Sequence, residues 1–173
     1  MKGQIWEPID SLPTLVASVV AWCVLAAFPG QGLTEDSGSP IFGVSIPKDY
    51  RTWELVGVAH ETGLDELRGI VGNSVAMAAY RSGELPFPDG AILVKRAWKH
   101  VRSAEFGPAF VPGSPTTIQV MVKDSRRYAQ TGGWGFGRFV DGQPVDEAQH
   151  RTCFGCHAAG VKGHDYVFSR LAP

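Results

Sequence analysis

The sequence lacks an excess of charge of either sign. Its 173 residues carry 16 Lys and Arg against 17 Asp and Glu, which gives a formal net charge of −1. Proteins that bind nucleic acid or an anionic membrane through their overall field are basic, so this balance argues against both kinds of partner. Internal repeats and low-complexity blocks are also absent. The length suits a single domain with a core large enough to enclose a cofactor.

Cysteine is scarce as well, with only three in the chain. Two of them lie in Thr152-Cys153-Phe154-Gly155-Cys156-His157, and Cys-x-x-Cys-His is the attachment signature of a c-type haem. In such a motif each thiol bonds to one vinyl group of the porphyrin, and the histidine binds the iron. The motif therefore predicts Cys153 and Cys156 as the attachment sites of haem c and His157 as the iron ligand.

Other readings of a Cys-x-x-Cys pair stay open at this level. A structural zinc ion needs about four N or S ligands, and the third cysteine, Cys23, lies far away in an apolar run. His150 and His164 are near enough in the chain to complete a tetrahedral site. A thioredoxin-like motif normally follows a strand and opens a helix in a βαβ unit, and the C-terminal position of this motif does not fit that pattern.

The N-terminal part differs in composition from the rest. Residues 12–28 form an uncharged, mostly apolar run, which is short for a membrane span and long for the apolar core of a signal peptide. We expect residues 1–29 to be a cleaved export signal or a membrane anchor, with a buried core helix as the alternative. Residues 30–45 are rich in Gly, Ser, Pro and Asp and predict a linker, which places the folded domain at 46–173. Export predicts a periplasmic protein, the compartment in which c-type haems are attached.

The pattern of apolar residues predicts both strands and short helices. Strands are expected over residues 54–59, 66–71, 91–98, 117–123 and 134–140, and short helices over 47–53, 74–81, 124–130 and 146–150. Asn73 is the expected N-cap of the second helix and Gly83 its end. Strands separated by short helices and hairpin-like turns indicate an α+β fold built on an antiparallel sheet.

The strand at 134–140 has an unusual face. Gly135 and Gly137 alternate with Trp134, Phe136 and Arg138, so one side of this strand is nearly bare. We expect a flat object such as a haem, or the commoner case of a closely packed helix, to approach the backbone there.

Several motifs together resemble one family. They are Pro-Lys-Asp-Tyr-Arg-x-Trp from residue 47, Phe-Pro-Asp-Gly-Ala-x-x-Val-Lys from 87, Val-Lys-Asp-Ser-x-x-Tyr from 122, Gly-Gly-Trp-Gly-Phe from 132 and Asp-Tyr-Val-Phe-Ser-Arg from 165, in addition to the haem motif. In this set and order they resemble the cytochrome P-460 family over residues 46–173. The resemblance implies a haem held against an antiparallel sheet, a periplasmic homodimer, and a lysine cross-linked to the porphyrin.

The resemblance also implies roles for particular residues. Lys95 stands at the position of the cross-linking lysine, and Arg68 resembles the arginine of the distal pocket. Asp146 and Glu147 are only nearby candidates for the carboxylate that relays protons in hydroxylamine-oxidising members. Met77 and Met121 are expected in the core, although a methionine that bound the iron would close its sixth position.

Two functions follow as expectations. The first is an exported mono-haem oxidoreductase that acts on hydroxylamine or nitric oxide at an open distal site and passes electrons to a soluble acceptor cytochrome. The second is a non-enzymatic haem protein that binds nitric oxide or carbon monoxide, or transfers electrons, as the related cytochrome c′-beta proteins do.

Overall fold

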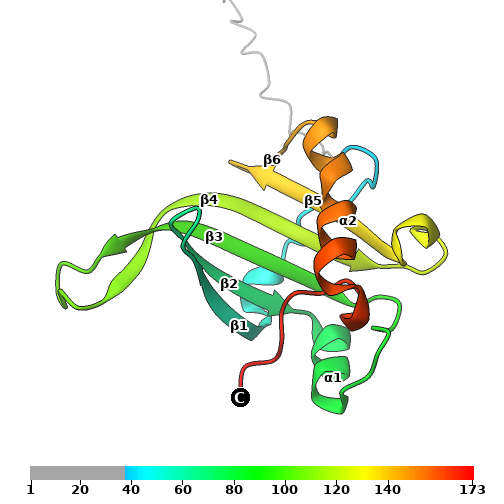
Figure 1. Cartoon of the computed structure of the whole chain (residues 1–173), viewed down its shortest axis with the longest axis horizontal. Helices are drawn as coiled ribbons and strands as arrows, with labels where there is room; N and C mark the ends of the chain where they lie inside the picture. Colours follow the sequence, from blue (N-terminus) through cyan, green and yellow to red (C-terminus); the bar gives the residue numbers. More distant parts are fainter. Residues whose placement is uncertain (1–37) are drawn as a thin grey trace, which may run out of the picture. The chain divides into compact units, whose positions relative to one another are not determined.

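The computed structural model describes residues 38–173, which form an antiparallel sheet of six strands with two α-helices (Figure 1). The strands are β1 (Glu54–Glu61), β2 (Glu66–Gly72), β3 (Ile92–Arg102), β4 (Phe110–Lys123), β5 (Trp134–Val140) and β6 (Gln143–Pro144). The helices are α1 (Ser74–Ser82) and α2 (Glu147–Val161), and three short 3₁₀ helices lie at Tyr50–Thr52, Ala129–Thr131 and Lys162–His164. Each strand pairs with the next one in the chain, which confirms the predicted α+β fold with an antiparallel sheet.

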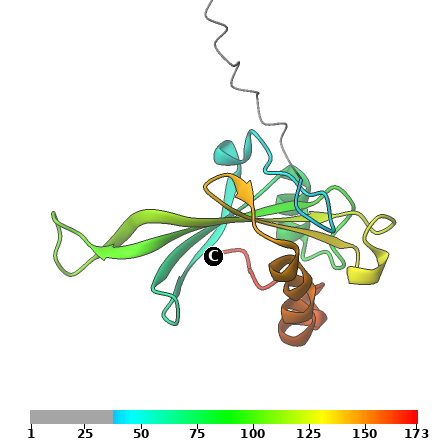
Figure 2. The same ribbon diagram turned by 90° about the horizontal axis from the view of Figure 1, so that it is seen from above.

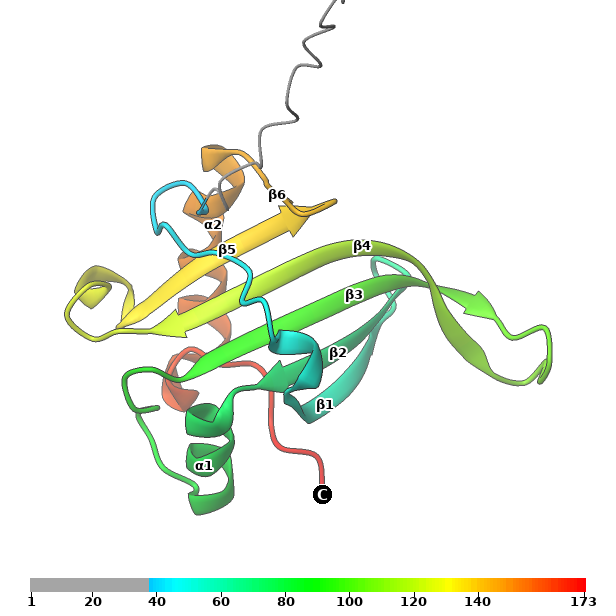
Figure 3. The ribbon, with the colours of Figure 1, turned by 180° about the vertical axis from the view of Figure 1, so that it is seen from behind.

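Strands β3 and β4 are longer than predicted and continue as a hairpin beyond their neighbours (Figures 1 and 3). The strand predicted at 117–123 begins seven residues earlier, at Phe110, and so includes Pro112 and Pro115. The structure accommodates both prolines because the β3–β4 register shifts on either side of Trp98, and proline is tolerated at such bulges.

The two faces of the sheet are covered by different parts of the chain. Helix α2 and the C-terminal tail lie on one face, and the segment from residue 38 to the 3₁₀ helix at Tyr50–Thr52 lies on the other (Figure 2). Part of this segment, residues 38–45, falls in the stretch assigned above to a linker. Its apolar residues Phe42 and Val44 are buried in the core, and the Ser39 hydroxyl donates a 2.7 Å hydrogen bond to the Phe136 carbonyl. The folded part therefore begins before the predicted boundary at Ile46.

The rest of the predicted linker and the predicted export segment lie outside the described residues. Among residues 38–173, no helix has both the length and the apolar character needed to cross a membrane.

Of the helices predicted from the sequence, the one at 74–81 is present and those at 124–130 and 47–53 are not. Asn73 caps α1 by accepting the Ala76 N–H, and Gly83 ends it with a left-handed φ of 69°, as predicted. The helix expected at 124–130 is wrong, because the Asp124 carboxylate accepts the N–H groups of Arg126 and Arg127 in a turn, a local competitor of helix. Only a 3₁₀ turn follows there, and another replaces the helix expected at 47–53.

The glycine face of β5 is closed by the chain itself. A Cβ on Gly135 would lie 2.3 Å from the Tyr128 ring, and one on Gly137 would meet Val44 at 3.1 Å. The packed helix expected on this face is therefore replaced by a turn residue, Tyr128, and by the irregular segment that contains Val44. The side chains that alternate with the glycines point to the opposite face, beneath α2.

Candidate haem site

Helix α2 and the sheet enclose a cavity of about 290 Å³. Its lining includes all five residues that the sequence analysis named for the site: Cys153, Cys156 and His157 from α2, Lys95 from β3 and Arg68 from β2. Residues three and four apart lie on the same side of a helix. Both thiols and the imidazole of the motif therefore face the sheet from one side of α2.

Strand register gathers the residues opposite the helix. Ile70, Lys95, Gln119 and Arg138 are consecutive partners across β2, β3, β4 and β5. Directly paired residues project to the same face of an antiparallel sheet. One row of the sheet thus places two cationic side chains, from Lys95 and Arg138, into the cavity.

The two cysteines are free thiols and differ in exposure. Cys153 is half-buried and Cys156 is exposed. Burial raises the pKa of the Cys153 thiol, an effect that the nearby Arg138 charge opposes. Neither thiol is committed to a disulfide, so both remain available for bonds to a haem.

His157 is oriented by a single hydrogen bond. Its Nδ1 lies 2.7 Å from the Tyr166 carbonyl oxygen, and because a carbonyl can only accept, Nδ1 carries the proton. The lone pair of the neutral ring is then on Nε2, which is the atom that an iron ion would bind. Burial also lowers the pKa of His157, which favours this neutral, ligating form.

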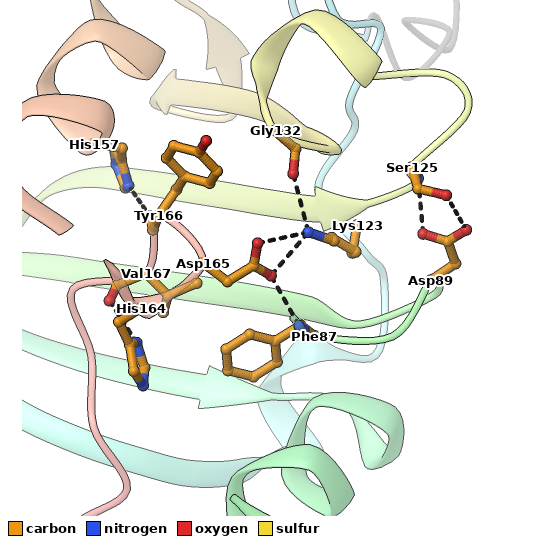
Figure 4. A network of polar contacts seen from close by, with 10 residues as sticks. All are labelled: Phe87, Asp89, Lys123, Ser125, Gly132, His157, His164, Asp165, Tyr166 and Val167. Atoms are coloured by element: carbon orange, nitrogen blue, oxygen red, sulfur yellow. Dashed lines mark hydrogen bonds and ion pairs between the residues drawn. The ribbon is translucent and has the colours of Figure 1, made fainter. Parts of the chain in front are cut away.

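The turn that supplies this carbonyl is fixed by a buried ion pair (Figure 4). The Lys123 ammonium donates to both Asp165 oxygens at 2.8 Å and to the Gly132 carbonyl at 3.0 Å, and Asp165 also accepts the Phe87 N–H. The two charged side chains are only 5% and 7% exposed. Asp165 and Tyr166 both have positive φ, of 48° and 62°, a conformation that non-glycine residues adopt at a cost. The ion pair holds this turn and thereby the carbonyl that orients His157.

The structure does not favour the zinc alternative. The fully buried His150 accepts the Arg138 N–H through Nε2, and its Nδ1 lies 2.9 Å from the Asp146 carbonyl. Nδ1 of His164 lies against the Val167 carbonyl and the Arg170 guanidinium. Both histidines are thus engaged in structural hydrogen bonds away from the two thiols.

Lys95 is the most perturbed cation of the cavity. Burial, followed by repulsion from the Arg68 charge, lowers its pKa from 10.5 to about 8. Among residues 38–173 its amine forms no hydrogen bond or ion pair. A sizeable fraction of this amine is therefore neutral near pH 8, and a neutral amine is a nucleophile.

Two arginines in the cavity have unsatisfied donors. Within the described part of the chain, Nε of Arg68 and Nε of Arg138 are buried without a hydrogen-bond partner, although buried donors normally have one. Arg68 also forms ion pairs with Glu61 and Glu66. A haem carries two propionate carboxylates, which are the kind of acceptor that guanidinium groups bind. The thiols, the oriented imidazole and the unsatisfied guanidinium donors together fit a haem.

Two carboxylates named from the sequence do not reach the cavity. Asp146 caps the N-terminus of α2, and Glu147 pairs with Arg151 on the exposed side of that helix. The buried Glu66 lies closer to the site, since its side chain is 3.6 Å from Arg68 and its charge acts on Lys95. The sequence analysis did not name Glu66, although it lies only two residues before Arg68.

The two methionines have different surroundings. Met77 is buried in the core on α1, as expected, where its sulfur would lie 3.0 Å from a Cβ on Gly72. Met121 packs against the core but also lines the cavity. The structure therefore leaves Met121 as the one of the two that borders the site.

Comparison with known proteins gives one family match. A family model described as Cytochrome P460 matches residues 47–169. No match was found among curated proteins.

Proposed function

The chain belongs to the cytochrome P460 family, and on this premise we propose that it is an exported mono-haem c-type cytochrome that oxidises hydroxylamine or nitric oxide. Membership of the family makes it a haem protein. In our proposal Cys153 and Cys156 form the thioether bonds and His157 binds the iron through Nε2. The haem, when bound, supplies an iron centre that accepts electrons from a small nitrogen compound and passes them to an acceptor.

One observation supports an enzyme above all: the half-buried amine of Lys95, which has no hydrogen-bond or ion-pair partner in the described part of the chain, lies in the same cavity as the haem motif. An amine whose pKa has fallen to about 8 is poised to bond to a porphyrin carbon. Formation of that bond is an oxidation, so its maturation needs an oxidant such as hydrogen peroxide. The cross-link is the feature expected of the hydroxylamine-oxidising members.

Arg68 and Glu66 complete the proposed site. The Arg68 guanidinium lines the cavity and can donate hydrogen bonds to a substrate oxygen. In our proposal the buried Glu66 carboxylate, 3.6 Å from Arg68, takes up the proton that leaves the substrate. Removal of the Glu66 carboxylate should therefore slow turnover without loss of the haem.

Mass spectrometry together with turnover tests this function. In protein matured with haem and treated with peroxide, we expect the 153–157 peptide joined through haem to the peptide that contains Lys95, and steady oxidation of hydroxylamine by an artificial acceptor. Lys95→Met should abolish the joined peptide and the turnover. Lys99→Met, on the same strand but exposed, should retain both. A free Lys95 peptide in an inactive, fully matured protein would refute the enzymatic proposal.

A second candidate function rests on Met121. If its thioether, which borders the cavity, bound the iron, the haem would be six-coordinate and restricted to electron transfer. A low-spin resting spectrum that turns high-spin in Met121→Ala would support this candidate. A high-spin protein that binds carbon monoxide or nitric oxide but does not turn over would instead be a gas-binding relative.

We also propose a periplasmic homodimer that delivers electrons to a soluble cytochrome. Large apolar side chains are exposed on the edge strand β1, at Leu55 and Val58, and on the β3–β4 hairpin, at Val101, Phe106 and Phe110. Exposed apolar surface of this kind is typical of subunit contacts. Light scattering should give twice the chain mass, and Val58→Glu should reduce it to one.

A further inference from the structure

A second group of ligating side chains lies at the turn between β1 and β2, apart from the residues that line the haem cavity. It consists of His60 on β1, Asp65 just before β2 and His100 on β3. Their ligand atoms all lie within 4.8 Å of one another. None of these residues lines the haem cavity, and neither the motifs nor the proposed function uses them.

The backbone of three successive strands holds the three residues, with His60 on β1, Asp65 directly before β2 and His100 on β3. His60 pairs with Leu67 across the β1–β2 hairpin, and the His100 N–H donates a 3.1 Å hydrogen bond to the Asp65 carbonyl. This arrangement brings together residues that are up to forty positions apart in the chain. The cluster is therefore set by the sheet and not by a chance meeting of mobile side chains.

The side chains are already close to a coordinating arrangement. Nε2 of His100 lies 3.0 Å from Oδ1 of Asp65, and the rings of His60 and His100 meet edge to face with centroids 4.5 Å apart. Two ligands on one tetrahedral ion, with bonds of about 2.0–2.2 Å, lie roughly 3.3–3.6 Å apart. The exposed His60 and Asp65 side chains need only small rotations to close the remaining gap.

One ligand is held more firmly than the others. The His100 ring packs against the Phe110 ring, with centroids 4.4 Å apart, and is mostly buried. A ring fixed in this way loses little conformational freedom on binding an ion. His60 and Asp65, which are exposed, would then close on the ion from the solvent side.

From this geometry we propose that His60, Asp65 and His100 bind a transition-metal dication, with Zn²⁺ and Cu²⁺ as the best-matched ions. Two imidazoles and one carboxylate are a set that suits Zn²⁺ and Cu²⁺, whereas Mg²⁺ and Ca²⁺ prefer oxygen ligands throughout. Three protein ligands leave a further position for water or another small ligand. A bound ion would also tie the β1–β2 turn to β3.

Calorimetric titration of the metal-stripped protein tests this site. We expect one equivalent of Zn²⁺ or Cu²⁺ per chain, with Cu²⁺ bound more tightly, and no binding of Mg²⁺. His60→Gln, Asp65→Asn and His100→Gln should each weaken binding by about tenfold or more, while Glu84→Gln, at an exposed carboxylate elsewhere, should leave it unchanged. Electron paramagnetic resonance of the Cu²⁺ form should show coupling to two imidazole nitrogens, and to one in His60→Gln.

The same titration in Cys153→Ser/Cys156→Ser separates this site from the haem motif. Retention of the single equivalent there supports the cluster whether or not the protein attaches haem. The proposal would be overturned if this variant no longer bound the metal, or if the unmutated protein bound neither Zn²⁺ nor Cu²⁺. It would also be overturned if His60→Gln and Asp65→Asn bound the metal with unchanged affinity. Both of the latter substitutions are at exposed side chains, so they test the site without endangering the fold.

Discussion

Replacement of Asp165 by Asn should be among the most damaging single changes in the chain. The substitution keeps the size of the side chain, tolerates the positive φ at this position, and leaves an oxygen to accept the Phe87 N–H. It removes the charge that faces Lys123, whose side chain is 5% exposed, and turns one of the two oxygens that accept from the ammonium into an NH2 donor. An ammonium group buried without its counter-charge is the costly outcome of a broken buried ion pair.

The expected loss is about 3–5 kcal/mol of unfolding free energy, or a fall in Tm of roughly 10–20 °C for a domain of this size. Urea denaturation followed by circular dichroism measures it. The double variant Lys123→Met/Asp165→Asn removes both charges and should recover much of the loss, with a coupling energy of about 2 kcal/mol or more between the two sites. Ser125→Ala, which breaks the neighbouring exposed contact with Asp89, is the control and should cost less than about 1 kcal/mol.

Asp165→Asn should also change the reduction potential of the haem. The turn held by Asp165 presents the Tyr166 carbonyl to His157, and a weaker hydrogen bond to Nδ1 makes the imidazole a poorer electron donor to the iron. The unpaired Lys123 charge acts in the same direction, so the reduction potential should rise in Asp165→Asn. A stability loss below about 1 kcal/mol, as for a hydrated surface pair, would refute the reasoning, and so would an unchanged potential.

Three further outcomes are expected. His150→Leu should cost about 1–3 kcal/mol in urea denaturation, because it leaves the half-buried Arg138 N–H without its partner. Gly135→Ala should cost about 1–3 kcal/mol by the same measurement, since its Cβ would lie 2.3 Å from the Tyr128 ring. With the Lys95 pKa lowered from 10.5 to about 8, the unfolded chain binds more protons between these values, so the stability of protein without attached haem should rise from pH 8 to 10.5. Lys95→Met should lack that rise.

Much of the fold was predictable because local signals and tertiary packing agree. All five predicted strands are present, and Asn73 and Gly83 bound α1 as their side-chain chemistry requires. The failures are places where local and long-range effects differ. Phe42 and Val44 lie in a stretch whose composition indicates a linker, yet burial against the sheet outweighs composition there.

The sequence predicted five residues of the candidate site, from the cysteine motif and from the resemblance to a family. The prediction was incomplete because other residues of the site are brought there by strand register and long-range contacts. The cysteine motif located the α2 residues, and the resemblance to a family located Lys95 and Arg68. Arg138 was not assigned to the site, because its place beside the cavity depends on the register of β3, β4 and β5. Asp165 was missed for a similar reason, since its partner Lys123 is 42 residues away.

Strand β5 shows how packing on one face of the sheet determines the chemistry on the other. Side chains alternate between faces, so a slip of one residue would exchange the two sets completely. In the observed register the Tyr128 ring leaves no room for a side chain at Gly135, and Phe139 with Val44 crowds the same space at Gly137, while Phe136 and Arg138 line the cavity. The slipped register would force aromatic or charged side chains into that space. The glycines therefore fix which side chains of β5 reach the cavity, although the space that a side chain at either glycine would fill is on the opposite face of the sheet.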